Sequence, residues 1–303
     1  MELTIEFVHE YMEFCETQKR LDWKTLKAYR IDLRQLLEYL EETGMPFCRE
    51  AIKSYTAWMN ERFRPRTVRR KLASIRAMTT WMLDEGLLEH NPFERLHLRV
   101  REPLTLPRTV PFRVVEQMLT AAHRQRRLYP NDKGALCGAA VLEMLFATGM
   151  RVSELCRLKA GDVDLNEGVI RVYGKNRKER VAYVTNREVL SVLRQYAREV
   201  PTGCHGTFFR NRHGKRLSED SVRRMIRKYG EMTDCSARVT PHMLRHTVAT
   251  QLLEADVDIR IIQKLLGHAS ILTTQIYTQV VDTKQRDTMM YKHPRNQFSI
   301  SQV

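Results

Sequence analysis

The chain has 303 residues, enough for two domains, and 43% of them are hydrophobic, which excludes a globally disordered chain. Its formal net charge of +15 points to a polyanionic partner. The charge is uneven, because residues 1–102 hold 18 basic and 17 acidic residues whereas residues 103–303 hold 33 and 19.

The cysteines and apolar stretches exclude further classes of protein. The six cysteines are scattered without a C-x-x-C pair, which argues against a zinc ribbon or a disulfide framework and favours free thiols. The N-terminus MELTIEFVHEY is acidic and amphipathic, unlike a signal peptide. The longest apolar stretch, residues 135–150, is interrupted by Glu143 and is too short to span a bilayer. We therefore expect a soluble, cytoplasmic protein with no membrane contact.

The first part of the chain is predicted to be helical. Residues 25–42 and 64–86 both carry apolar side chains at helical spacing. Four of the ten prolines fall between residues 92 and 111, which indicates a linker. We expect a helical domain over residues 1–95 and a linker over residues 96–112.

The second part, residues 113–303, has a mixed pattern. Residues 168–185 alternate apolar and polar side chains on both sides of a Lys-Asn turn, which predicts a β-hairpin. Helical patterns occur at residues 114–127, 135–148, 188–199, 218–229, 241–254, 259–266 and 271–280. The expected fold class is therefore mainly α with a small β-sheet or hairpin in the second domain.

Four segments of the second domain carry side chains suited to holding and attacking a phosphate group. They are ATGMRVSEL with Arg151 and Glu154, YGKNRKER with Lys175, TPHMLRHTVAT with His242 and Arg245, and LLGHASILTTQIYTQ with His268 and Tyr277. Taken singly, such pairs, turn lysines and tyrosines are commonplace on helix surfaces, in hairpins and in cores. The signal is the order and spacing of all four segments together.

In that order the four segments resemble the tyrosine recombinase family, also called phage integrases, and most closely its Xer-like branch. The family pattern is T-G-x-R-x-S-E-L, a G-K-x-x-K-x-R hairpin, H-x-x-R, G-H, and a Tyr nine residues after that His. Residues 25–40 and 67–92 resemble the family's N-terminal core-binding domain, so the resemblance covers nearly the whole chain. Asn176 stands where Xer relatives usually carry Gly, and Asn tolerates a left-handed turn.

The resemblance implies a site-specific recombinase that integrates, excises or resolves DNA. Residues 1–95 would be the core-binding domain and residues 113–303 the catalytic domain with a C-terminal tail. Tyr277 would cut one strand and form a 3′-phosphotyrosine with a free 5′-hydroxyl. Because that ester keeps the energy of the broken bond, ATP is not expected as a cofactor. No metal is expected either, because the basic side chains of the four segments would supply the charge that a metal would.

The resemblance also implies a role for each remaining residue. Arg151, Arg245 and His268 would hold the charge that develops on the equatorial phosphate oxygens. His242 would assist as base and hydrogen-bond donor, and Lys175 would protonate the departing 5′-oxygen. Glu154 would orient Arg151 and His242.

Basic segments predict where DNA binds. Residues 62–76 hold seven basic and no acidic residues, and residues 208–228 add a second basic surface. Without the resemblance, a solvated charged face explains the first segment as well. With it, the expected DNA-binding residues are Arg66, Arg69, Arg70, Lys71 and Arg76. The expected partner is double-stranded DNA with recombination sites in the bacterial nucleoid. A tetramer, formed by this chain alone or together with a paired homologous recombinase, would bind two such sites. Residues 278–303 would dock on a neighbouring protomer.

Two alternatives would give the chain a different function. The D-V-D pairs Asp162/Asp164 and Asp256/Asp258 could bind Mg²⁺, but they precede a hairpin and a helix, where turns and caps explain them better. Residues 259–277 also resemble a helix-turn-helix, which would suit a non-catalytic DNA-binding regulator. That alternative leaves the first three segments unexplained. The same nicking chemistry would also permit a type IB topoisomerase activity, and the sequence does not distinguish chromosome, transposon, phage or plasmid substrates.

Overall fold

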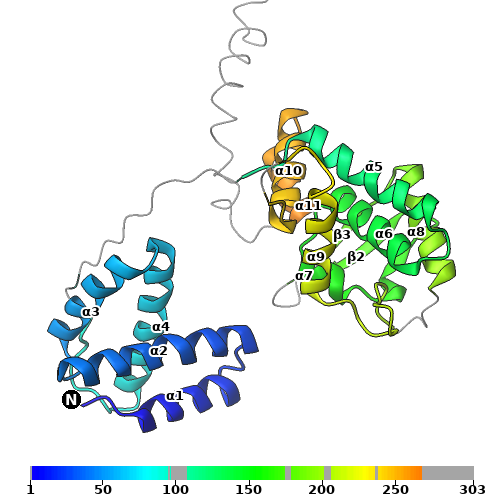
Figure 1. Cartoon of the computed structure of the whole chain (residues 1–303). Helices are drawn as coiled ribbons and strands as arrows, with labels where there is room; N and C mark the ends of the chain where they lie inside the picture. The colour runs from blue at the N-terminus through cyan, green and yellow to red at the C-terminus, as the bar shows by residue number, and fades with distance from the viewer. Residues whose placement is uncertain are drawn as a thin grey trace, which may run out of the picture. The chain divides into compact units, whose positions relative to one another are not determined.

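The computed structural model describes residues 2–94, 96, 108–174, 179–200, 206–235 and 238–267. The chain divides into two compact units, Met1–Leu104 and Thr105–Val303, which Figure 1 colours from blue to cyan and from green to orange. The domain limits expected from the sequence, residues 1–95 and 113–303, remain predictions.

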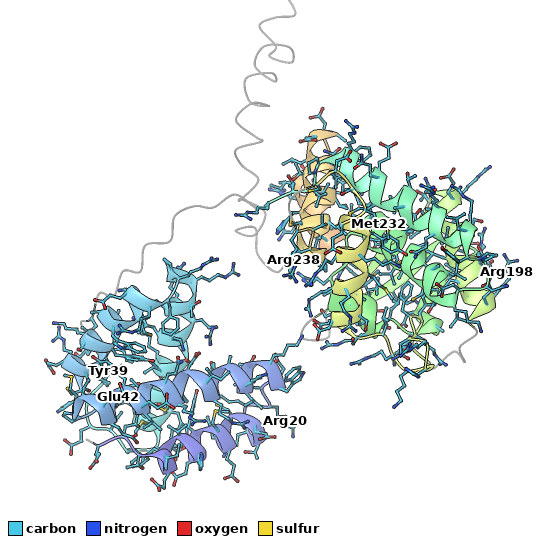
Figure 2. The ribbon with its side chains drawn as sticks, viewed as in Figure 1. Arg20, Tyr39, Glu42, Arg198, Met232 and Arg238 are labelled. Atoms are coloured by element: carbon cyan, nitrogen blue, oxygen red, sulfur yellow. The ribbon has the colours of Figure 1, made fainter. Side chains whose placement is uncertain are left out.

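The described part of the first unit is helical. Its elements are α1 (Ile5–Thr17), α2 (Trp23–Thr43), α3 (Arg49–Arg62) and α4 (Pro65–Asp84). Helix α2 begins where the Asp22 carboxylate accepts hydrogen bonds from two backbone N–H groups, and it ends at Gly44 in the left-handed conformation. The shared core includes Tyr39, labelled in Figure 2, whose ring lies 5.0 Å from that of Tyr55. The predicted helices at residues 25–42 and 64–86 are confirmed, with bounds that differ by one or two residues.

The described part of the second unit combines helices with one small sheet. In chain order its elements are α5 (Phe112–Leu128), α6 (Lys133–Thr148), α7 (Val152–Arg157), the short 3-10 helix η1 (Ala160–Asp162), β1 (Val163–Asp164), β2 (Val169–Tyr173), β3 (Glu179–Tyr183), α8 (Arg187–Glu199), α9 (Glu219–Gly230), α10 (Pro241–Glu254) and α11 (Ile259–Leu266). The helix predicted at residues 271–280 lies outside the described residues.

The sheet is antiparallel, with the strand order β1-β2-β3. In the β2–β3 pair Arg171 lies opposite Val181. Ile170, Val172 and Ala182 are buried in the core, whereas Arg171 is exposed, so the alternation read from the sequence is that of a half-buried hairpin. The predicted fold class, mainly α with a small sheet in the second domain, is confirmed.

Helix α6 is the centre of the second unit. Residues 135–145 of α6 are all buried, because α5, α8 and α10 pack around this helix. A helix covered on every side is expected to be apolar all round. Its buried carboxylate, Glu143, lies 2.5 Å from Nε2 of His123 on α5. No helix in the described part of the chain has the length and hydrophobicity needed to cross a membrane.

Two left-handed glycine turns meet beside α10 and position the candidate site. Gly149 ends α6 at φ +59°, and Gly267 ends α11 at φ +67°. A Cβ on Gly149 would lie 2.5 Å from Cδ2 of Leu266, and a Cβ on Gly267 would lie 2.9 Å from Nη1 of Arg180. Both positions therefore need glycine for conformation and for space. The close fit holds the end of α11 against the start of α7 and against β3.

Candidate active site

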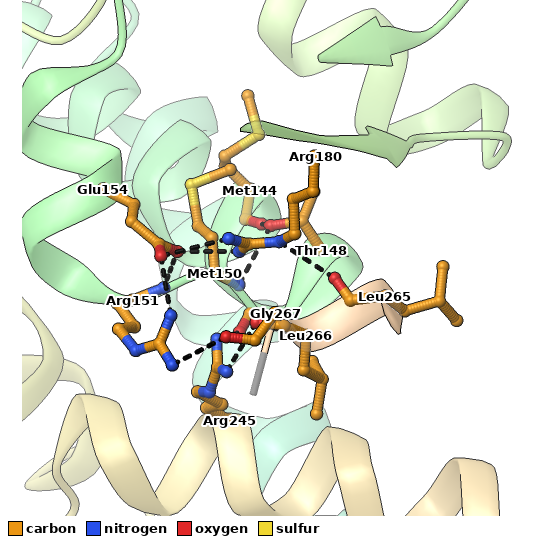
Figure 3. Close-up of polar contacts among 11 residues, drawn as sticks. Met144, Thr148, Met150, Arg151, Glu154, Arg180, Arg245, Leu265, Leu266 and Gly267 are labelled. Atoms are coloured by element: carbon orange, nitrogen blue, oxygen red, sulfur yellow. Dashed lines mark hydrogen bonds and ion pairs between the residues drawn. The ribbon is translucent and has the colours of Figure 1, made fainter. Parts of the chain in front are cut away.

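The structure brings four of the predicted site residues onto neighbouring elements. Arg151 is the N-cap of α7, Glu154 lies in its first turn, and Arg245 lies on α10 one turn after His242. Gly149 and the end of α11 link these helices through hydrogen bonds to Arg245 (Figure 3). The other predicted catalytic residues, Lys175, His268 and Tyr277, lie outside the described residues.

Glu154 is the anion at the centre of this group. Its carboxylate, 4% exposed, accepts bonds from the backbone N–H and Nη1 of Arg151, both at 2.8 Å. It also accepts a two-pronged bond from Arg180 Nη1 and Nη2, at 3.0 and 2.7 Å. Burial alone would raise the pKa of Glu154, but the hydrogen bonds from Arg180 and Arg151 and the charge on Arg180 outweigh it and hold the pKa below its usual value. Glu154 is therefore a fixed negative charge between two arginines.

The C-terminus of α11 supplies three successive backbone carbonyls to three different arginines. Arg180 Nε donates to the carbonyl of Leu265 at 3.0 Å, Arg245 Nη2 to that of Leu266 at 2.6 Å, and Arg151 Nη2 to that of Gly267 at 3.0 Å. The last carbonyls of a helix lack partners within the helix and carry the negative end of its dipole, so they suit cations. Figure 3 shows the three guanidinium groups converging on this turn.

The three arginines differ in exposure and in charge balance. The side chain of Arg151 is 35% exposed and that of Arg180 is 10% exposed, and Arg245 as a residue is 5% exposed. Three guanidinium groups with one carboxylate leave a net positive charge around the end of α11. Arg151 can thus offer donors to an anion from outside while its orientation is fixed by Glu154 and Gly267.

His242 and His246 lie on α10 on either side of Arg245. His242 is exposed, as a group that meets a ligand must be. Burial, and to a smaller extent electrostatic interaction with His242 and with the charge on Arg245, lowers the pKa of His246. His246 is therefore neutral at neutral pH, next to Arg245, which is predicted to bind phosphate, and near His242, which is predicted to act as base.

Sequence reasoning missed Arg180. It is the final residue of the G-K-x-x-K-x-R pattern in the hairpin, so the signal was present. The pattern gave no role to that Arg, because its partner Glu154 lies 26 residues away and Leu265 lies 85 residues away in the sequence.

The predicted DNA-binding face of α4 requires one correction. Lys71 is only 2% exposed, and its ammonium donates to Asp32 Oδ1 at 3.0 Å and to the Gln35 side chain. It stands three residues after Val68 and four before Ile75, both buried, so it lies on the inward face of α4. The expectation of a surface phosphate contact from Lys71 was wrong.

The other four residues of that face are exposed. Arg69, Arg70 and Arg76 follow Arg66 by three, four and ten residues along α4. Arg70 also donates to the buried Asp32, and Arg76 stacks over Phe93 with its guanidinium 5.1 Å from the ring centroid. Both arginines are thereby oriented from inside the first unit.

The second basic segment also presents its charges outward. In α9 the side chains of Val222, Ile226 and Tyr229 are buried, while Arg224 and Arg227 are exposed. Arg198 and Arg238, labelled in Figure 2, are further exposed arginines of the second unit.

The D-V-D pairs act as turn and cap residues. Asp164 Oδ1 accepts from the N–H groups of Asn166 and Glu167 at 2.9 and 3.1 Å. Asp258 Oδ1 accepts from Arg260 N at 2.7 Å and caps α11. Among the residues that the structure describes, no three His, Cys, Asp or Glu side chains gather in a way that could hold a metal ion.

Models of two protein families match this chain. The phage integrase family matches residues 108–284, and the N-terminal SAM-like domain of phage integrases matches residues 8–86. A tyrosine recombinase of Agathobacter rectalis is 45% identical over 96% of this chain and 97% of its own length. Tyrosine recombinase XerD of Halalkalibacterium halodurans is 33% identical over 97% of this chain and 100% of its own length.

Solved structures resemble the chain as well. XerA recombinase has 27% identity and a TM-score of 0.52, covering 95% of this chain and 99% of that one. XerH recombinase bound to a palindromic difH substrate has 18% identity and a TM-score of 0.74, covering 94% of this chain and 85% of that one. A lambda integrase tetramer bound to a Holliday junction has 18% identity and a TM-score of 0.67, covering 88% and 74%. At 18% identity the last two likenesses show the fold alone.

Proposed function

This chain belongs to the phage integrase family of tyrosine recombinases, which act in site-specific DNA recombination, and we propose that it cuts and rejoins DNA through Tyr277. The observation that supports this most is the network in which Arg151, Glu154 and Arg245 are tied to the end of α11. In the sequence, that end is followed at once by His268 and, nine residues later, by Tyr277. A non-catalytic helix-turn-helix regulator is not favoured, since the family match spans residues 108–284.

The arginines would supply the electrostatic part of catalysis. A phosphodiester in transfer carries negative charge on its equatorial oxygens, and donors fixed in advance stabilise that charge without reorganising. Arg151 and Arg245 are held by backbone carbonyls and by Glu154, so their guanidinium groups are already oriented. We assign them, with His268, to the equatorial oxygens.

The remaining residues would move protons. The Tyr277 phenol attacks phosphorus and gives its proton to His242, while the bond to the 5′-oxygen breaks and Lys175 protonates that oxygen. The products are a 3′-phosphotyrosine and a free 5′-hydroxyl. Attack of a 5′-hydroxyl on the ester reverses every step, so rejoining needs no nucleotide. The donors of Arg151, Arg245 and His268 would supply the charge that a metal would.

The partners follow from the same family. XerH binds a difH substrate, and a tetramer of lambda integrase binds a Holliday junction. We propose that this chain also binds two double-stranded recombination sites as a tetramer, alone or with a paired homologous recombinase, on DNA in the bacterial nucleoid. The exposed Arg66, Arg69, Arg70 and Arg76 would contact phosphates through the first unit.

A trapping experiment tests the proposal. DNA in covalent complexes from cells that carry the chain is sequenced to obtain the site, and a nicked version of that site serves as a suicide substrate. The wild-type chain and Tyr173→Phe, a change at an exposed tyrosine of β2, should leave a protein–DNA band on a denaturing gel. Tyr277→Phe should bind the site and leave no band. A band that survives in Tyr277→Phe would remove Tyr277 as the nucleophile, and binding without cleavage by the wild type would support the regulator.

A further inference from the structure

One arginine in the network has no role in the proposed chemistry. Arg151 and Arg245 are assigned to the phosphate, but the Arg180 side chain is 10% exposed and its donors point inward. It binds both oxygens of Glu154 and the carbonyl of Leu265 at once. Arg180 therefore connects strand β3 with α7 and with the end of α11.

We propose that Arg180 is a positioning residue, which sets the orientation of Arg151 and Arg245 without touching DNA. It would act in two ways. It holds the Glu154 carboxylate in place for Arg151, and it fixes the turn whose next two carbonyls, those of Leu266 and Gly267, bind Arg245 and Arg151. This inference rests on the proposed function of the site.

The geometry asks for arginine at this position. The three bonds leave from Nε, Nη1 and Nη2, which only a planar guanidinium presents together in fixed directions. A lysine would keep the positive charge beside Glu154 but could not donate hydrogen bonds to both carboxylate oxygens and to the Leu265 carbonyl in the same geometry. Gly267 leaves the space in which this guanidinium lies, since a Cβ there would be 2.9 Å from Nη1. Charge and shape thus make separate contributions, and two substitutions can separate them.

Removal of Arg180 should change the protonation of Glu154. In the wild type the bonds from Arg180 are the foremost influence that lowers the pKa of this buried carboxyl. Without them, burial and the single partner Arg151 remain, so Glu154 takes up a proton at higher pH. A protonated Glu154 no longer holds Arg151 by charge. Cleavage by the variant should therefore fail at a higher pH than cleavage by the wild type.

The experiment compares Arg180→Gln and Arg180→Lys with the wild type on the nicked suicide substrate. Arg180→Gln should lower the single-turnover cleavage rate roughly 10- to 100-fold, by analogy with the loss seen when residues that orient metal ligands are removed. DNA affinity should stay close to that of the wild type, and the acid limb of the rate–pH profile should move to higher pH. Arg180→Lys should recover the position of the acid limb better than it recovers the rate. The matched control is Arg194→Gln, which removes an exposed arginine that donates to a backbone carbonyl, that of Leu165, elsewhere in the unit.

A double-mutant cycle separates positioning from general weakening of the fold. If Arg180 acts through Glu154, Arg180→Gln should cost much less in a Glu154→Gln background than in the wild type. Additive losses of cleavage rate in the double mutant would overturn the inference. So would an Arg180→Gln variant that cleaves at the wild-type rate with an unshifted acid limb. Both outcomes would leave the proposed function standing. A wild-type chain that forms no covalent adduct would overturn both. If Arg180→Gln does not fold, Arg180→Lys decides, because a wild-type rate in that variant would contradict the need for a guanidinium.

Discussion

Lys71 donates a hydrogen bond to Asp32 across 3.0 Å, and the two side chains form a buried ion pair between α4 and α2. Arg70 and Ser74 of α4 also donate to the same carboxylate. A basic residue in the middle of a stretch that is predicted to bind phosphate thus stabilises the interior of the first unit. Its neighbours on the helix, such as Arg66, are exposed and remain candidates for DNA contacts.

A basic residue of α4 that stabilises the fold and one that contacts DNA should respond differently to substitution. Lys71→Met should lower the free energy of unfolding of the first unit by about 3 kcal/mol, because it leaves a buried carboxylate short of one cation. Arg66→Ala should leave stability unchanged but weaken DNA binding and lower the salt dependence by about one phosphate contact. All three tryptophans, Trp23, Trp58 and Trp81, lie in the first unit, so tryptophan fluorescence in urea reports its unfolding alone. Normal stability in Lys71→Met would show that the pair contributes little.

His246 should make the second unit less stable in mild acid. Its pKa is lowered in the folded chain, first by burial, so the unfolded chain binds more protons as pH falls below about 6.5. The contribution of the neutral imidazole to stability is therefore complete above that pH and is lost as pH falls toward the folded pKa. His246→Gln should flatten this part of the stability–pH curve.

Urea unfolding followed by circular dichroism at several pH values measures this effect, and tryptophan fluorescence identifies the transition of the first unit. The control is His213→Gln, at an exposed position of the second unit, which should keep the wild-type dependence. An unchanged curve in His246→Gln would assign the acid sensitivity to other groups.

The elements were predictable from the sequence because periodicity depends on neighbours along the chain. Helices α2 and α4 and the β2–β3 hairpin follow from the spacing of apolar residues. Lys71 was misplaced because its charge was given more weight than its position between Val68 and Ile75. The role of Arg180 could not be read at all, since it depends on contacts between segments that only the fold brings together.

The motifs predicted only part of the site, because they also depend on spacing along the chain. A motif shows which residues occur at a fixed spacing, and it placed Arg151, Glu154 and Arg245 on elements that the structure joins. It does not show what holds their guanidinium groups. The backbone carbonyls at the end of α11 have no signature in the side-chain sequence except the glycine that ends the helix, Gly267.

Lys175 should act on the leaving group rather than on binding. In the sequence it lies between Tyr173, where β2 ends, and Glu179, where β3 begins, so it belongs to the segment that connects the two strands. General acid catalysis typically contributes about 10²–10⁴-fold. Lys175→Ala should therefore cleave the suicide substrate more slowly by about that factor, while it loses at most about one phosphate contact in DNA binding.

A substrate with sulfur in place of the bridging 5′-oxygen tests this role, because a departing thiolate needs no proton. The sulfur substrate should restore most of the lost rate to Lys175→Ala. It should not rescue Arg151→Ala or Arg245→Ala, whose donors act on the equatorial oxygens. If it leaves the Lys175→Ala defect untouched, Lys175 is only a phosphate clamp. The same substrate tested on Lys178→Ala would then show whether this lysine, three residues later in the sequence, protonates the 5′-oxygen.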